Sequence, residues 1–389
     1  MNPGRQKLLY ILYVFGLLCL LVYSYTQVDL SLTLSKISIW QSIQKTLQYV
    51  GYFQRPLSTT LYCILLIVFF TLYVFMLRLA QNNKLNRKTV WSIIVLVTVI
   101  LVFSYPAFSY DMFNYMFTAK TVLFYQKNPY VVIPLNFAGV EPWLSFMHWT
   151  HNASVYTPLW IGMTLVPYLF GFGFFLAILF NTKILLAGFY LLTAWFVEKS
   201  LEMMDRKVSL ISLIFFSLNP LTIIESLVSS HNDIAMMAFA MGAYYFYLKK
   251  QSLYSFLMLS LSIASKFVTI FWLPLYFFGW KKGSILFFSV ISFFAILTQR
   301  EVQGWYFLLI LPVVALQPAR REFTVLAVCV SCGLLLRYIP FLYFGDWNAP
   351  VPTIENILLF LPILFGALFL GINWFRRRKN KVSSVFTIG

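Results

Sequence analysis

The chain of 389 residues is 60% hydrophobic and only 11% charged, and its mean hydropathy is +0.79. This composition excludes a water-soluble domain and indicates an integral membrane protein. The net charge of +17 does not indicate a nucleic-acid partner, because the cations form short clusters between apolar segments, as in the loops of membrane proteins.

Apolar windows long enough to span a bilayer recur along the chain. They lie at 8–27, 56–80, 89–108, 157–173, 175–197, 208–228, 234–248, 252–280, 284–298, 305–318, 323–343 and 354–374. Several are short, so we expect one all-α polytopic membrane domain over 1–389 with about 11–13 transmembrane helices. The first window is too long for a cleaved signal peptide and is not followed by a small-residue cleavage site. The segment 28–55 is expected to be an interfacial helix or a plain connecting loop.

The lysine and arginine clusters predict the orientation, because such clusters accumulate on the cytoplasmic side. They place both termini in the cytoplasm and the segment after 89–108 on the outer face, if 252–280 is a two-helix hairpin. The clusters are Arg5 with Lys7, Lys84 with Arg87 and Lys88, Lys249 with Lys250, Lys281 with Lys282, Arg320 with Arg321, and 376–381. Counting membrane crossings forward from the N-terminus and backward from the C-terminus gives numbers that differ by one between 157 and 228. A helix broken at Asn219-Pro220 would account for the difference.

The long polar segment 109–156 begins with SYDMFNYMFTAKTVLFYQKNPYVV, where Asp111 follows an apolar window. On a helical wheel one side carries Asp111, Asn114, Tyr115 and Thr118, and the other carries Phe113, Met116, Phe117, Lys120 and Phe124. We therefore expect an amphipathic interfacial helix whose apolar face rests in the lipid headgroup boundary, with Lys120 reaching lipid phosphates. Asp111 would then face the protein or water, unless it merely caps the helix.

Lys266 is the single charge in the apolar run SIASKFVTIFWLPLYFF, 262–278. An intramembrane lysine suggests a functional site, although a lysine at the outer end of a span can also snorkel to the surface. Asp233 could likewise only start a helix, and Arg300 could only pair with Glu301. The tryptophans Trp143, Trp149, Trp160 and Trp305 suit either a membrane-interface belt or a platform for a sugar ring.

No metal site is expected. His148 and His151 are one helical turn apart, but no cluster of acidic residues or cysteines accompanies them. Cys329 and Cys332 lie within an apolar window, where packing explains them.

The order of several motifs resembles the GT-C class of integral-membrane glycosyltransferases, and within it the bacterial polyprenyl-phosphate-dependent mannosyltransferases. The motifs, over 105–315, are D-x-x-x-Y…N-P-Y, Y-x-P-L-W, N-P…E…H-N-D, S-K-F…L-P and Q-x-W-Y…L-P. The resemblance implies a GT-C-like helical enzyme with a catalytic acidic residue in its first large outer loop and a lipid-phosphate-linked sugar as donor, without another cofactor. It divides the chain into the outer loop 109–156, the rest of the glycosyltransferase-like module 157–315, and the C-terminal spans with a basic tail 316–389. The chain departs from the class by its two extra spans before Asp111 and by Tyr110 beside it, where many members have a second acidic residue.

The residues themselves suit this chemistry. Asp111 is the expected catalytic base for an acceptor hydroxyl. Lys266, Arg300 and Lys120 are expected to stabilise the leaving phosphate, with His231 as a further donor. The candidate substrate-binding residues are Lys266, His231, Asp233, Tyr115, Lys120, Arg300, Trp305, Tyr306, Tyr156, Asn128, Tyr130 and Glu225.

The sequence therefore predicts a hexosyltransferase, with mannose as the first choice of sugar from the resemblance. It would act at the extracytoplasmic face of a bacterial plasma membrane on a glycan, glycolipid or protein acceptor. The alternative is a transporter or flippase of a lipid-linked sugar, which could also use Lys266 and helices broken at Pro220 and Pro274. No internal repeat supports this alternative.

Overall fold

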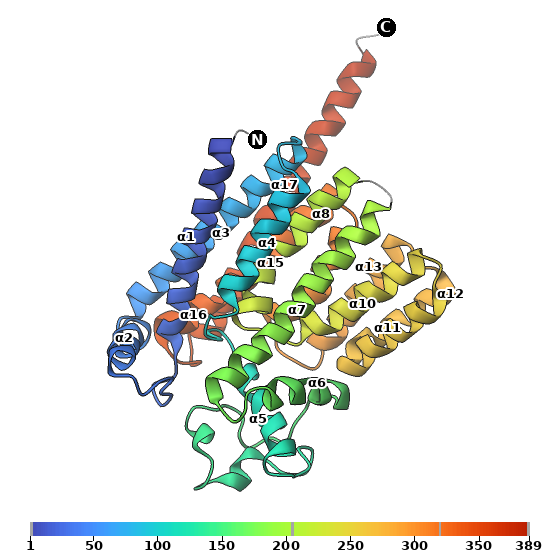
Figure 1. Cartoon of the computed structure of the whole chain (residues 1–389). Coiled ribbons are helices and arrows are strands. Elements are labelled where there is room, and N and C mark those ends of the chain that lie inside the picture. The colour runs from blue at the N-terminus through green and yellow to red at the C-terminus, as the bar shows by residue number, and fades with distance from the viewer. Residues whose placement is uncertain (1–2, 204–205, 319, 387–389) are drawn as a thin grey trace.

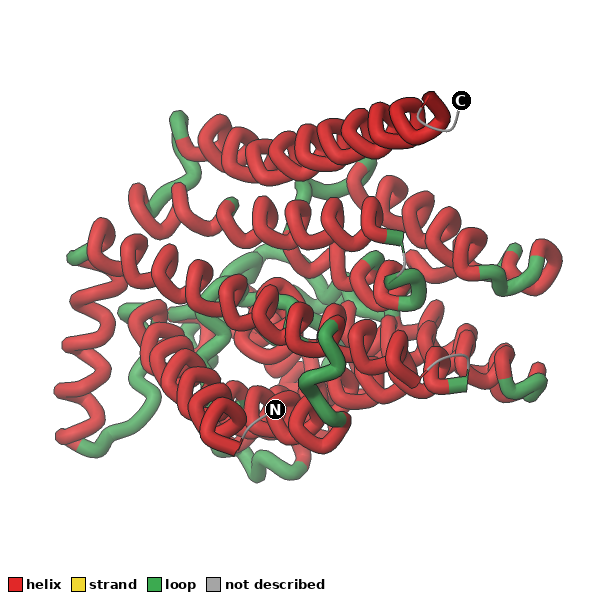
Figure 2. Tube along the Cα trace, turned by 90° about the horizontal axis from the view of Figure 1, so that it is seen from above, coloured by secondary structure: helices red, strands yellow, loops and turns green. Residues whose placement is uncertain are grey.

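The computed structural model describes residues 3–203, 206–318 and 320–386, and every regular element in these ranges is a helix. Figures 1 and 2 show long helices packed side by side, so the predicted all-α fold is confirmed. In chain order the elements are α1 (Pro3–Ser24), η1 (Tyr25–Gln27), α2 (Ser38–Gln48), η2 (Tyr49–Phe53), α3 (Arg55–Gln81), α4 (Arg87–Leu101), α5 (Asp111–Leu123), η3 (Pro134–Phe137), η4 (Pro142–Ser145), α6 (Pro158–Leu169), α7 (Phe175–Glu202), α8 (Arg206–Ser217), α9 (Pro220–Ile223), η5 (Ile224–Val228), α10 (Asp233–Leu248), α11 (Ser252–Ser265), η6 (Phe267–Trp272), α12 (Leu275–Phe278), α13 (Lys282–Leu297), η7 (Gly304–Leu309), α14 (Leu311–Ala315), α15 (Arg321–Leu336), α16 (Tyr338–Phe344) and α17 (Val351–Phe386).

Within the described ranges, five helical stretches are long and apolar enough to cross a membrane. They are Gln6–Gln27, Arg55–Gln81, Phe175–Glu202, Arg321–Phe344 and Val351–Arg376. The pair Val208–Ser217 and Pro220–Val228, bent by 53°, would be a sixth span if it crosses as one unit. Other predicted windows correspond to apolar helices of 10–17 residues. The membrane fold is thus confirmed, and the larger number of crossings expected from the sequence stays a prediction.

Two breaks in the helices position polar residues. Asn219 is extended (φ −63°, ψ 128°) and its side chain accepts a hydrogen bond from the Leu221 N–H, before Pro220 starts α9. The predicted break is confirmed, because proline lacks an N–H and disfavours a helical conformation in the preceding residue. The second break is at Lys266, which is extended (φ −159°, ψ 119°) between α11 and η6.

Both termini lie at one end of the molecule, and α5, α6 and the loop that joins them lie at the other (Figure 1). The short connection between α3 and α4 lies at the end of the termini. In the same view α6 runs across the ends of the long helices rather than along them. The helix in the predicted span 157–173 is only 12 residues long and does not lie along the long helices, so this span is not supported, and the disputed crossing stays open.

The central helix α10 is packed between α7 and α11 (Figure 1), and most of its side chains are buried. Small residues permit this close packing. At Gly242, for example, a Cβ would lie 3.0 Å from the Phe196 ring. Helix α10 therefore begins inside the protein, and its first residue, Asp233, is buried.

The segment 28–55 contains helix α2, so the helical alternative is confirmed. Its polar face turns inward, since the buried Gln44 donates to the Leu32 carbonyl (2.6 Å) and the buried Gln48 to the Asp29 carbonyl (2.9 Å). Ile39 and Ile43 are exposed on the same helix.

Helix α5 forms where the sequence predicted it, but its apolar face does not face lipid. Phe113, Met116 and Phe117 are buried under aromatic side chains of the following loop and of α7. The expectation of a lipid-facing surface is wrong, because the polar segment 124–157 folds back over the helix and supplies its apolar partners.

Candidate active site

A cavity of about 750 Å³ lies where α5 meets the ends of α10, α11 and η7. A volume of this size accommodates a sugar with its neighbouring groups. The lining comes from separate parts of the chain: Asp111, Asn114, Tyr115, Phe117, Thr118, Thr121, Pro129, Val132, Pro134, Trp149, Asn152, Ala153, Ser154, Val155, Tyr156, Thr157, Asn232, Ser265, Lys266, Phe267, Val268, Arg300, Glu301, Gln303, Trp305 and Tyr306.

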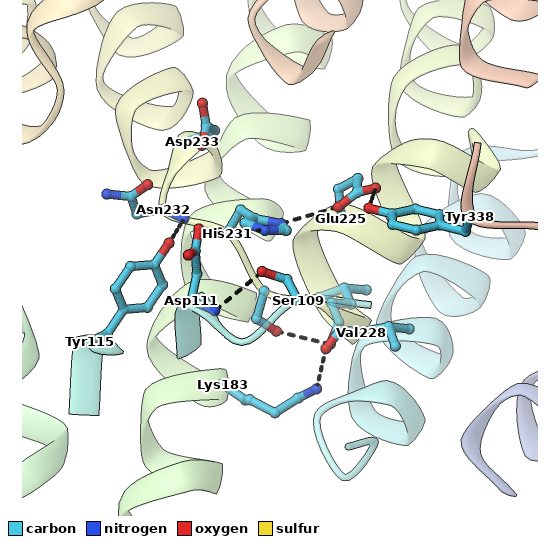
Figure 3. Close-up of polar contacts among 12 residues, drawn as sticks. Ser109, Asp111, Tyr115, Lys183, Glu225, Val228, His231, Asn232, Asp233 and Tyr338 are labelled. Atoms are coloured by element: carbon cyan, nitrogen blue, oxygen red, sulfur yellow. Dashed lines mark hydrogen bonds and ion pairs between the residues drawn. The ribbon is translucent and has the colours of Figure 1, made fainter. Parts of the chain in front are cut away.

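Asp111 is the first residue of α5, and its side chain is 25% exposed at the cavity wall. Its backbone N–H donates to Ser109 Oγ (3.2 Å) (Figure 3). The N-cap position belongs to Tyr110 and has no side-chain cap hydrogen bond, so capping does not explain Asp111. Burial raises the pKa of the Asp111 carboxyl, and the neighbouring His231 and Lys266 side chains oppose this rise.

His231 lies behind Asp111 and has no exposed surface. Its Nε2 is 3.9 Å from Asp111 Oδ2, and its Nδ1 is 3.1 Å from Glu225 Oε2. The other Glu225 oxygen, Oε1, accepts from the Tyr338 hydroxyl at 2.8 Å (Figure 3). The imidazole stacks on Trp305 at a ring distance of 4.0 Å. His231 and Glu225 do not line the cavity, whose wall here is formed by Asp111 and Trp305, so their direct contact with substrate stays a prediction that the geometry does not favour.

Lys266 and Arg300 supply the positive charge of the cavity wall. Lys266 Nζ pairs with Asp233 Oδ2 at 2.7 Å and lies 5.3 Å from the Tyr306 ring centroid. Asp233 does not line the cavity and is committed to this ion pair, so its expected contact with substrate stays a prediction. Arg300 is exposed, and no ion pair joins it to Glu301 in the described part of the chain.

A family model described as alpha-(1->6)-mannopyranosyltransferase, N-terminal domain, matches residues 13–282. The chain belongs to this mannosyltransferase family. The predicted resemblance is confirmed, and the protein is a membrane glycosyltransferase that transfers mannose to an acceptor. No curated protein and no solved structure matches the chain.

The mannosyltransferase cavity has an aromatic wall. Tyr115 packs edge-on against Tyr156 (4.8 Å between ring centroids), and its hydroxyl accepts from the Asn232 N–H at 3.3 Å. Trp149, Trp305 and Tyr306 add further rings. Trp143 and Trp160 are buried and do not line the cavity, although Trp160 packs edge-on against Tyr115 (5.2 Å between ring centroids), so neither is an exposed belt residue or a sugar platform. Aromatic faces of this kind suit the apolar face of a sugar ring.

Like His231, Glu225 and Asp233, three further predicted site residues of the mannosyltransferase do not line the cavity. Lys120 is committed to Glu141, with Nζ 2.7 Å from Oε2, and does not reach a lipid phosphate. Asn128 accepts from the Tyr130 N–H (2.9 Å), and the Tyr130 hydroxyl donates to the Tyr156 carbonyl (2.7 Å). These contacts shape the loop, and a direct role of the three residues in binding stays a prediction.

Sequence reasoning missed Lys183, which is buried in α7. Its Nζ donates to Ser104 Oγ (2.9 Å) and to the Val228 carbonyl (3.0 Å). Ser104 precedes Asp111 on the chain, and Val228 precedes His231. Lys183 is the single charge in 175–197, so the criterion that identified Lys266 also identifies it.

Two further findings concern metals and histidines. Within the described residues, no group of three or more histidines, cysteines and carboxylates is arranged to hold a metal ion. His148 instead stacks on Tyr110 at a ring distance of 3.7 Å.

Proposed function

We propose that this mannosyltransferase uses a polyprenyl-phosphate mannose as donor and a sugar hydroxyl as acceptor, at the extracytoplasmic face of the membrane. The observation that carries the proposal is one cavity with a carboxylate, Asp111, on one wall and two cations, Lys266 and Arg300, on another. A lipid-linked donor fits a cavity at the ends of apolar helices, because the isoprenoid chain can stay in the bilayer while the sugar enters the protein.

The proposed reaction is a displacement at the anomeric carbon. The acceptor oxygen attacks this carbon while its proton passes to the Asp111 carboxylate, and the bond from carbon to the phosphate oxygen breaks. The electron pair of that bond stays on the polyprenyl phosphate. A base with a pKa raised by burial is stronger once ionised, and this suits Asp111 to the proton transfer.

Arg300 is the stronger candidate for the donor phosphate. Lys266 already has a carboxylate partner, whereas Arg300 is exposed at the cavity and is not paired with Glu301. A guanidinium also binds phosphate through two parallel hydrogen bonds. Replacing Arg300 by glutamine should raise the donor KM about tenfold to 150-fold, the loss expected for charge-assisted hydrogen bonds. Lys266→Met should have a smaller effect.

The family is named for an α-(1→6) linkage, so we propose the 6-hydroxyl of a mannose residue as the acceptor group. This group is a primary alcohol and projects away from its ring, which lets it reach Asp111 while the ring rests on the aromatic wall.

The test uses purified protein in detergent with a short-chain polyprenyl-phosphate mannose. An α-mannoside acceptor should trigger release of polyprenyl phosphate, and the matching 6-deoxymannoside should not. Asp111→Asn should reduce the release roughly 10²–10⁴-fold, the usual range for a lost general base. Asp346→Asn, at an exposed aspartate outside the cavity, is the matched control.

Near-normal release by Asp111→Asn would remove this residue from the mechanism. Release that is supported equally by both acceptors would contradict the 6-hydroxyl. Failure of the wild-type protein to release any polyprenyl phosphate with a range of acceptors would contradict the lipid-linked donor.

A further inference from the structure

Behind the cavity, four side chains form a line from Asp111 into the protein (Figure 3). Successive contacts are Asp111 Oδ2 to His231 Nε2 at 3.9 Å, His231 Nδ1 to Glu225 Oε2 at 3.1 Å, and Glu225 Oε1 to the Tyr338 hydroxyl at 2.8 Å. The side chains of His231 and Glu225 are 0% exposed. Neither residue lines the cavity, so substrate binding does not explain the contact between them.

The backbone around Glu225 and His231 holds these two side chains in place. Glu225 lies on the π-helical turn η5, and Ser230 has a left-handed conformation (φ 61°) just before His231. The His231 N–H donates to the Glu225 carbonyl at 2.9 Å, which closes the turn. Gly304 leaves room for the carboxylate, since a Cβ there would lie 2.5 Å from Glu225 Oε1.

The contacts of Glu225 indicate which charge stabilises it. Tyr338 donates to Oε1 of Glu225, and Oε2 has only the His231 ring as a near partner. The contact of Oε2 with His231 Nδ1 has the distance of an ion pair and not the geometry of a hydrogen bond. Because a buried carboxylate is stable only when it is paired or hydrogen-bonded, this contact favours a positively charged ring. The other ring nitrogen, Nε2, faces a second carboxylate, Asp111.

The balance of charge favours a protonated imidazole. The carboxylates around the line are Asp111, Glu225 and Asp233, and the permanent cations are Lys266 and Arg300. One more positive charge on His231 makes this group neutral. The Trp305 ring, stacked on the imidazole at 4.0 Å, also favours a cation at its face.

We propose that Glu225 and His231 form a positioning pair: Glu225 keeps His231 protonated, and the imidazolium fixes the Asp111 carboxylate and keeps it ionised for the transfer. The proposal rests on the proposed role of Asp111 as base. His231 does not exchange a proton with the substrate in this scheme, and the acceptor proton stays on Asp111 until the product leaves.

The pair predicts a specific change in the pH dependence of kcat. The rate should rise with pH as Asp111 ionises. An opposite charge about 4 Å away lowers a carboxyl pKa by about 1–3 units, so its removal should move the acidic limb of the profile to higher pH by at least about one unit. This shift is expected for His231→Gln and for Glu225→Gln, with the donor KM unchanged within about twofold.

The matched control is Ser226→Ala, next to Glu225 on the same turn, whose hydroxyl has no hydrogen-bond partner among the described residues. Its acidic limb should coincide with that of the wild type. The position of a limb does not depend on how much protein is active, so it remains measurable for a variant that folds in low yield.

An unshifted limb in both glutamine variants would overturn the proposal, whatever their activity. A rise in donor KM of more than tenfold without a shift would also overturn it and would assign the pair to binding. These outcomes are distinct from failure of the proposed function, which Asp111→Asn tests without altering the pair.

Discussion

Asp111 lies in a partly buried position, where ionisation of its carboxyl costs free energy because the charge loses contact with water. Burial raises its pKa, so between the ordinary carboxyl value near about 4 and the raised value the folded state binds more protons than the unfolded state. Stability that depends on this group is therefore present at low pH and is lost as the pH rises through that window.

Asp111→Asn should consequently unfold at a higher temperature than the wild type at neutral pH, although it is inactive. The physical reason is that the amide removes the cost of burying a charge while it keeps the shape of the side chain. Thermal melts at a series of pH values measure the effect, and the advantage of the variant should shrink toward pH 4. A variant that melts lower than the wild type at neutral pH would show that the ionised carboxylate is net stabilising.

Lys183 connects the segment that carries Asp111 to the segment that carries His231, through Ser104 and Val228. In Lys183→Met the aliphatic stem remains and these hydrogen bonds are lost. We expect kcat to fall by about tenfold, because each hydrogen bond contributes about 0.5–1.5 kcal/mol to fixing the two segments. The melting temperature should change little, since the cost of burying the polar amine is also removed.

Leu186→Met is the matched control, one helical turn along the buried face of α7. It should retain nearly full kcat. If Lys183→Met also retains full kcat, Lys183 only fills space in the core.

At the scale of elements, the loop after α5 is attached to this helix through a buried ion pair. Glu141 accepts from Lys120 (2.9 Å), from the Tyr125 hydroxyl (2.7 Å) and from the Trp143 N–H (2.9 Å). The Glu141 side chain is 0% exposed and that of Lys120 is 13% exposed. This pair holds the loop wall of the cavity against α5.

Glu141→Gln should loosen this wall, because it leaves the buried Lys120 charge uncompensated at a cost of about 3–5 kcal/mol. Faster limited proteolysis within 124–157 and a raised acceptor KM are the expected results. Adding Lys120→Met to Glu141→Gln should restore part of the protection, since no unpaired charge then remains. Equal proteolysis of the single variant and the wild type would show that the aromatic contacts alone hold the loop.

Of the two helix breaks, only one can be predicted from the residues next to it. Pro220 predicts the break before α9, because proline constrains its own residue and the one before it. The break at Lys266 has no such marker, and the lysine lies there because its charge is paired with Asp233 at the start of a neighbouring helix.

At the scale of the whole molecule, both termini lie opposite the end that carries the cavity (Figure 1). The charge clusters predict that the end with the termini faces the cytoplasm, and on that prediction we expect the cavity to open on the outer side. Val140, on the loop after α5, is 72% exposed, and Lys250, between α10 and α11, is also exposed. Both are suitable for cysteine labelling after replacement of the four native cysteines.

A cysteine at 140 should react with an impermeant thiol reagent in intact cells, and a cysteine at 250 should react only after permeabilisation. The expected difference follows from the orientation that the charge clusters predict. The reverse pattern would invert the protein in the membrane and place the cavity in the cytoplasm.

The sequence by itself determined the membrane class, the positions of most helices, the break at Pro220 and the family, because apolar composition, proline and motif order are properties of contiguous residues. It also identified Asp111, Lys266, Arg300, Trp305 and Tyr306, which the structure brings to one cavity.

Only the tertiary structure decided how these residues are used. The sequence could not place Lys120 on Glu141, or His231 between Asp111 and Glu225, because such pairings depend on how distant segments pack. It also could not show that the apolar face of α5 is buried or that α6 runs across the long helices. Lipid and protein interior are both apolar, so hydropathy identifies a face that avoids water without indicating which of the two covers it.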